Sequence, residues 1–154
     1  IIIFIRRNIM PTRTASAEWK GTLKEGNGVM RLPDGNFEGP YTFVSRFESG
    51  EGTNPEELVG GAIAGCFSMF LSALISKEDL TPTSIQTTAS VTIESGDDGP
   101  SVTQISLETT ADVPGISDQK LQELAQTAKE KCPISKLYAG TSISMAVRLV
   151  SVSH

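Results

Sequence analysis

The amino-acid sequence predicts an α+β fold in which small antiparallel sheets accompany one long, central helix. Segments that alternate apolar and polar residues occur in pairs, with short glycine-rich turns between them, as in β-hairpins. Two longer segments instead repeat their apolar residues at helical spacing. The predicted order is β-β-β-α-β-β-α-β, and its hairpins favour this class over a doubly wound parallel sheet.

The first part of the chain is expected to form a small antiparallel sheet. The pair Asn27-Gly28 is a strong hairpin signal, and it lies between two alternating segments. In the third segment Arg46 would point to the opposite face from Phe43 and Phe47, because side chains alternate along a strand. The predicted strands are 15–24, 29–32 and part of 37–47, and the predicted turns are 25–28 and 33–36.

The central helix is predicted over residues 52–74 and carries Cys66 in its second half. Asn54 suits the N-cap, Pro55 the first helical position and Glu57 the third, where it completes a capping box. No charged residue follows Glu57, so we expect a helix buried in the core rather than a membrane span. Another backbone could closely approach its small residues, which are Gly60, Gly61, Ala62, Ala64 and Gly65.

The rest of the chain is expected to add a hairpin, a second helix and a last strand. Alternation with abundant threonine, valine and isoleucine indicates the strands, and leucine and alanine at helical spacing indicate the helix. Cys132-Pro133 interrupts this helix, and one short helical turn is expected to follow. The predicted elements are strands 84–94, 102–111 and 141–151 and a helix from Ser117 or Asp118 to Lys131.

A chain of 154 residues is long enough for one domain, which we assign to residues 10–154. Residues 1–9 place an apolar run before two arginines, the reverse of a signal peptide, and Met10 resembles a natural start, so we treat them as a leader outside the fold. The net charge of −5 argues against nucleic acid or an anionic membrane as a partner. Two cysteines are too few for a secreted disulfide scaffold, and we expect a cytoplasmic protein.

Cys66 and Arg46 are the first candidates for chemistry. Apolar surroundings raise the pKa of a buried thiol and leave it inert, so a reactive Cys66 needs a positive charge from another segment. Arg46 could supply this charge, since it stands among aromatic and apolar residues just ahead of the helix. The alternatives are a cysteine that only fills space in the core and an arginine that is solvated on its strand, and on pattern alone the solvated arginine is the simpler interpretation.

Cys132 and Glu56 are the other two candidates. If Pro133 begins the short helix, Cys132 is its N-cap, where the helix dipole favours a thiolate, although it could equally be a space-filling cysteine. Glu56 lies ten residues before Cys66, which is about 15 Å along an unbroken helix, so it could reach Cys66 only from a second, antiparallel chain. On pattern alone, Glu56 is more simply a carboxylate that stabilises the helix N-terminus.

Other kinds of site find little support in the sequence. His154, the single histidine, ends the chain, which argues against a Cys-His catalytic pair and against a zinc site. The motifs of a nucleophile elbow, a P-loop and a dinucleotide-binding turn are missing. We therefore expect neither a metal nor a cofactor.

Several of these segments together resemble the osmotically inducible protein C (OsmC) family, which includes the organic hydroperoxide resistance (Ohr) proteins. The resemblance extends from about Ala15 to the last strand and is closer to the OsmC branch than to the Ohr branch. The segments that carry it are RFESGEGTNPEELVGGAIAGCFSMFLS at 46–72, Leu80 to Ile85, Val113-Pro114-Gly115 and Lys131 to Ser135.

This resemblance implies an intertwined homodimer with active sites at the subunit interface. It also implies a cysteine-based peroxidase, a peroxiredoxin-type oxidoreductase that reduces organic hydroperoxides and, more weakly, hydrogen peroxide in oxidative and osmotic stress defence. Cys66 matches the family's peroxidatic cysteine and Cys132 its resolving cysteine, so a sulfenic acid at Cys66 would be followed by a Cys66–Cys132 disulfide. Arg46 and Glu56 match the active-site arginine and glutamate. An external dithiol, such as a lipoylated protein, would reduce the disulfide.

The sequence leaves two rival functions open. One is a non-catalytic dimer that binds a small ligand or senses oxidation through its cysteines. The other is a thiol-dependent acyl hydrolase, which the lack of an internal histidine disfavours. For the peroxidase, we expect a preference for apolar hydroperoxides, because the neighbours of Cys66 in sequence are Ile63, Phe67, Met69 and Phe70.

Overall fold

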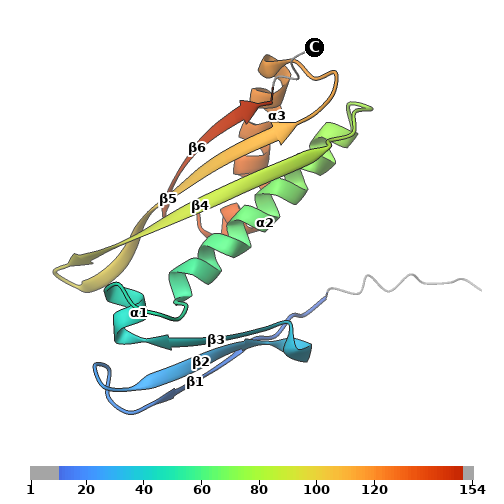
Figure 1. Cartoon of the computed structure of the whole chain (residues 1–154). Coiled ribbons are helices and arrows are strands. Elements are labelled where there is room, and N and C mark those ends of the chain that lie inside the picture. Colours follow the sequence, from blue (N-terminus) through green and yellow to red (C-terminus); the bar gives the residue numbers. More distant parts are fainter. Residues whose placement is uncertain (1–10, 151–154) are drawn as a thin grey trace, which may run out of the picture. The chain divides into compact units, whose positions relative to one another are not determined.

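The computed structural model of the chain describes residues 11–150 (Figure 1). These residues fall into two compact units, and the boundary between them lies between Asn54 and Pro55. The expected leader, residues 1–9, is outside the described residues. The assignment of residues 10–154 to one domain stays a prediction.

The first unit is a three-stranded antiparallel sheet followed by a short helix. Its strands are ordered β1-β2-β3, as predicted. A 3₁₀ turn, Pro33–Gly35, joins β2 to β3 at the second predicted turn. The elements are β1 (Ser16–Lys20), β2 (Asn27–Leu32), β3 (Phe37–Thr42) and α1 (Phe43–Phe47).

The first hairpin turn lies earlier in the chain than the sequence predicts. Asn27 and Gly28 belong to β2, and the chain reverses just before them, where the Gly26 N–H donates to the Thr22 carbonyl at 2.9 Å. Gly28 is needed inside the strand because the rings of Trp19 and Tyr41 meet over it, with centroids 5.2 Å apart. A Cβ on Gly28 would come within 2.6 Å of the Tyr41 ring.

The predicted strand at residues 37–47 is wrong beyond Thr42, because residues 43–47 form the helix α1. A capping box starts this helix. The Ser45 N–H donates to Thr42 Oγ1 at 3.1 Å, and the Thr42 N–H donates to Ser45 Oγ at 2.8 Å. Arg46 therefore lies on a helix and not on the outer face of a strand.

The second unit contains three helices and one three-stranded sheet. The sheet order is β4-β5-β6, and helix α2 lies against β4, α3 and α4. Figure 1 shows α2 running along β4. The elements are α2 (Pro55–Ser76), β4 (Ser84–Gly96), β5 (Gly99–Asp112), α3 (Asp118–Lys131), α4 (Pro133–Leu137) and β6 (Ser142–Leu149).

The last strand departs from the expected antiparallel arrangement. β4 and β5 form the predicted antiparallel hairpin, but β6 pairs with β5 in parallel, with Ile105 opposite Ile143. A parallel neighbour requires a crossover, and the helices α3 and α4 supply it. The α+β class is confirmed, with the second sheet mixed rather than purely antiparallel.

Helix α2 is buried along one face. Its residues at a spacing of four, Ile63, Phe67, Leu71 and Ile75, are all 0% exposed, and they pack with apolar residues of the sheet and of α3. The opposite face of α2 is exposed in the single chain, and Met69 on that face is 78% exposed. By length and composition α2 could also cross a membrane, but its packing on β4, α3 and α4 favours a core helix.

Candidate active site

The site centres on Cys66, in the fourth turn of α2. The residues of α2 that follow Glu57 are uncharged, so the immediate surroundings of this thiol along the helix are apolar. Cys66 is partly exposed in the single chain, although its neighbour Phe67 is fully buried. The predicted helix is thus confirmed, and it places the sulfur at the border between the buried and the exposed faces.

Cys132 lies where α3 ends and α4 begins. Pro133 is the first residue of α4, so Cys132 is the N-cap, as the sequence predicts. The Cys132 N–H donates to the Ala128 carbonyl at 2.9 Å in the last turn of α3, and its own carbonyl accepts from the Lys136 N–H at 3.0 Å. These two bonds hold a fully buried cysteine at a fixed corner of the chain.

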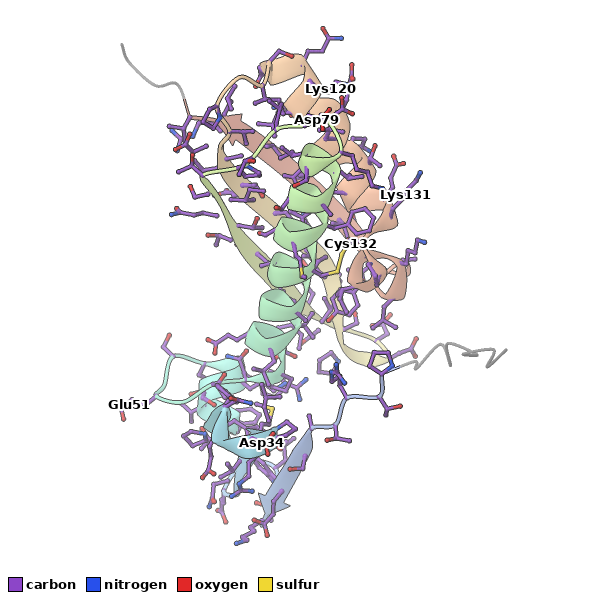
Figure 2. All side chains as sticks on the ribbon, turned by 90° about the vertical axis from the view of Figure 1, so that its right-hand side faces the viewer. Asp34, Glu51, Asp79, Lys120, Lys131 and Cys132 are labelled. Carbon is purple, nitrogen blue, oxygen red and sulfur yellow. A yellow bond between two sulfur atoms is a disulfide. The ribbon has the colours of Figure 1, made fainter. Side chains whose placement is uncertain are left out.

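The two cysteines are joined by a disulfide within the second unit. Their Cα atoms are 6.3 Å apart, inside the usual range of about 4.4–6.8 Å for this bond. Figure 2 shows the bond beside the label of Cys132, between α2 and α4. Cys66 and Cys132, which the resemblance identifies as the peroxidatic and the resolving cysteine, are therefore covalently bonded.

Three lysines and one glutamate lie within four residues of Cys132 in the sequence, although the whole chain carries a net charge of −5. Lys129 and Lys131 lie in the last turn of α3, and Lys136 lies in the last turn of α4. Burial raises the pKa of Tyr138, the residue that ends α4, so its phenol stays protonated at neutral pH.

Glu56 is the second residue of α2 and is 9% exposed. Because α2 is continuous from Pro55 to Ser76, the rise between Glu56 and Cys66 is about 15 Å. Glu56 and Cys66 of one chain are therefore not neighbours, in agreement with the distance expected from the sequence. A role for Glu56 at the cysteine of a second chain stays a prediction.

Arg46 belongs to the first unit and borders an aromatic cavity of about 230 Å³. Its guanidinium lies over the Phe47 ring, 5.0 Å from the centroid. Since the cysteines belong to the second unit, the approach of Arg46 to Cys66 stays a prediction. The cavity is lined by Trp19, Leu23, Tyr41, Thr42, Phe43, Arg46 and Phe47.

Two further features bear on the chemistry of the site. Within residues 11–150, no group of three or more His, Cys, Asp or Glu side chains could hold a metal ion.

The buried hydroxyl of Ser135 lies three residues after Cys132, and the sequence analysis did not identify it. The spacing Cys-Pro-x-Ser at a helix start is the signal that could have pointed to it.

Known proteins are similar to this chain in sequence. Residues 48–147 match the family model described as OsmC-like protein. Over 126 residues the chain is 42% identical to the protein named Peroxiredoxin OsmC in Escherichia coli (strain K12), which covers 81% of this chain and 88% of that relative. The Shigella flexneri protein of the same name matches equally well.

Solved structures share the fold. An OsmC-like protein from Mycoplasma pneumoniae superposes with a TM-score of 0.72 at 15% identity, covering 93% of this chain and all of that chain. The organic hydroperoxide resistance protein OhrB of Bacillus subtilis has a TM-score of 0.66 at 21% identity, covering 88% of this chain and 98% of that chain.

Proposed function

The chain belongs to the OsmC-like protein family, and from this premise we propose that it is a thiol-dependent peroxidase that reduces organic hydroperoxides and, more weakly, hydrogen peroxide. The observation that carries the proposal is the Cys66–Cys132 disulfide, which joins the partly exposed helix cysteine to the buried N-cap cysteine. The names of the relatives, a peroxiredoxin and an organic hydroperoxide resistance protein, agree with it.

In the first step the Cys66 thiolate attacks the peroxide. The sulfur takes the terminal oxygen and becomes a sulfenic acid, the O–O bond breaks, and the organic part leaves as an alcohol after taking up a proton. In the second step the Cys132 thiol attacks the sulfenic sulfur and water leaves, which gives the disulfide. The distance of 6.3 Å between the two Cα atoms supports the second step, because it lies within the usual range for a disulfide.

Arg46 and Glu56 are assigned to activation of Cys66. A guanidinium is always charged and carries a planar fork of donors, so it can hold a thiolate and a peroxide oxygen together. Glu56 would orient the guanidinium from the partner chain of a homodimer. The open face of α2 supports such a dimer, because a Cβ built on Gly61 or Gly65 meets no atom within 4 Å in the single chain.

The hydroperoxide substrate is expected to carry an apolar organic group. The aromatic cavity beside Arg46, with Phe43 and Phe47 in its walls, favours an organic group over water. The disulfide is then reduced by an external dithiol, such as that of a lipoylated protein. We expect this cycle in the cytoplasm, under oxidative or osmotic stress, without a metal, cofactor, nucleic acid or membrane.

Peroxide consumption in the presence of a dithiol tests the proposal. Cys66→Ser should abolish turnover, because it removes the nucleophile. Cys132→Ser should form no disulfide but should still consume one equivalent of cumene hydroperoxide. Wild-type protein that binds the hydroperoxide without consuming it, whichever dithiol is supplied, would favour a non-catalytic binding or sensing dimer.

A further inference from the structure

The hydroxyl of Ser135 is buried without a hydrogen-bond partner. Ser135 is 5% exposed, and within residues 11–150 its Oγ is the buried side-chain oxygen or nitrogen atom that makes no hydrogen bond. Burial of an unpaired hydroxyl is unfavourable, so native proteins seldom contain one without a reason. An atom that becomes an acceptor in another state of the protein would supply the missing partner.

A second serine of the same chain shows what Ser135 lacks. Ser45 is the third residue of α1, and its Oγ accepts the N–H of the N-cap residue Thr42 at 2.8 Å. Ser135 is the third residue of α4, but the N–H of its N-cap, Cys132, already donates to the Ala128 carbonyl. The Cys132 carbonyl, the group that corresponds to an acceptor of Ser45 Oγ in α1, already accepts the Lys136 N–H at 3.0 Å. The group of the N-cap residue that makes no capping hydrogen bond is therefore the side chain of Cys132, with its sulfur.

The redox state of Cys132 decides whether this sulfur can accept. In the structure it is bonded to Cys66, and neutral sulfur is only a weak acceptor. After reduction it can be a thiolate, whose charge makes a hydrogen bond much stronger. We propose that in the reduced protein the Ser135 hydroxyl donates a hydrogen bond to the Cys132 thiolate, which makes Ser135 a further catalytic residue. The inference rests on the proposed function, because it concerns disulfide exchange at the same site.

The exposure of the two cysteines sets the direction of that exchange. Cys132 is 0% exposed and Cys66 is partly exposed, so a thiolate of the external dithiol attacks Cys66 Sγ. A bond forms between the dithiol and Cys66, the Cys66–Cys132 bond breaks, and Cys132 leaves with the electron pair as a thiolate. The second thiol of the dithiol loses its proton to water and attacks the dithiol's bonded sulfur, which releases Cys66. The dithiol is oxidised by two electrons and the protein disulfide is reduced.

Ser135 acts on the leaving group of this reaction. A hydrogen bond to the charged form lowers the pKa of a thiol, and a thiol of lower pKa leaves faster. Within the second unit, α2 adds no charge beyond Glu57, so the charged residues closest to Cys132 in sequence are those of the helices that it joins. They are Lys129, Glu130, Lys131 and Lys136, and the partly buried phenol of Tyr138 lies next to them in sequence. All are unchanged by a substitution at Ser135.

Titration of the Cys132 thiol, followed by its thiolate absorbance in a Cys66→Ser background, tests the hydrogen bond. Ser135→Ala should raise the pKa of Cys132 by about one to two units, the effect of losing a charge-assisted hydrogen bond. Ser135→Thr keeps the hydroxyl and should retain the lower pKa. Ser144→Ala, on the exposed face of β6, should change nothing. An unchanged pKa in a folded Ser135→Ala variant would overturn the proposal.

Stability in the two redox states separates this role from a merely structural one. Ser135→Ala should destabilise the reduced protein, whereas in the oxidised protein it removes an unpaired buried hydroxyl and should be neutral or stabilising. Reduction of the disulfide by dihydrolipoamide should slow by about three- to tenfold. Equal destabilisation of both states would contradict the proposal.

None of these measurements uses a peroxide, so their failure is distinct from failure of the peroxidase function. A shifted pKa in a protein that consumes no peroxide would support the hydrogen bond and contradict the peroxidase function. Full peroxidase activity with an unshifted pKa would do the reverse.

Discussion

Cys66, in the fourth turn of α2, is bonded to Cys132, the N-cap of α4, with 6.3 Å between their Cα atoms. The bond ties two helices whose cysteines are 66 residues apart in sequence. Backbone hydrogen bonds to both α3 and α4 fix the position of Cys132. The disulfide therefore links this fixed position to the long helix α2.

Reduction of this disulfide should lower the free energy of unfolding by about 4 kcal/mol in the chain-entropy model for a loop of this length. Urea unfolding with and without a dithiol measures the difference. Cys132→Ser should show the same low stability in both conditions. A stability that is insensitive to the dithiol in the wild type would mean that the bond constrains little of the unfolded chain.

A chain of hydroxyls holds α2 to the sheet and predicts a matched pair of variants. Ser68 Oγ donates to Thr87 Oγ1 at 2.7 Å, and Thr87 Oγ1 lies 2.9 Å from Thr109 Oγ1. Thr87→Val should destabilise the protein by about 1–3 kcal/mol, because it leaves the two outer hydroxyls unpaired. The control is Thr88→Val on the exposed face of the same strand, where thermal unfolding should shift little.

The proposed dimer makes a prediction at Gly65. A side chain there meets no atom within 4 Å in the single chain, so Gly65→Leu should leave the monomer fold intact. If the open face of α2 packs against a second chain, the same variant should weaken the dimer and the peroxidase activity together. Light scattering on a sizing column measures the mass. Gly140→Leu, also without neighbours but outside α2, is the matched control and should keep the dimer.

Arg46 should be more sensitive to substitution than its surface counterpart Arg31. Arg46→Lys keeps the charge but loses the planar fork, so kcat/KM for cumene hydroperoxide should fall by about 10- to 100-fold. The guanidinium of Arg31 pairs with Glu38 at 3.1 Å on the surface of the sheet in the same unit, so Arg31→Lys should keep full activity. An equal kcat/KM for Arg46→Lys and the wild type would show that the guanidinium of Arg46 takes no part in the reaction.

The sequence predicted those parts of the fold that local signals specify. Pro133 placed Cys132 at a helix start, Ser117 marked the start of α3, and period-two alternation located β4, β5 and β6. The segment 43–47, FVSRF, was misassigned as a continuation of the preceding strand, although its apolar residues at 43, 44 and 47 do not alternate with polar ones. The capping pair Thr42 and Ser45, which decides between strand and helix, was overlooked.

Features that depend on distant parts of the chain could not be read from the local pattern. The parallel pairing of β6 arises from the crossover through α3 and α4, and no residue of β6 specifies it. The pairing of Cys66 with Cys132 came from the family resemblance rather than from spacing. The orphan hydroxyl of Ser135 depends on the last hydrogen bond of α3, which occupies the N–H of Cys132. The roles of Arg46 and Glu56 stay predictions, because they require a geometry that two chains would share.

Thiol titration with mass spectrometry, after one equivalent of cumene hydroperoxide is added to the fully reduced protein, tests the central proposal most directly. The proposal predicts the loss of both thiols, a mass lower by two hydrogen atoms, and a proteolytic fragment in which Cys66 is linked to Cys132. Two thiols that remain free, with the hydroperoxide unconsumed, would contradict it.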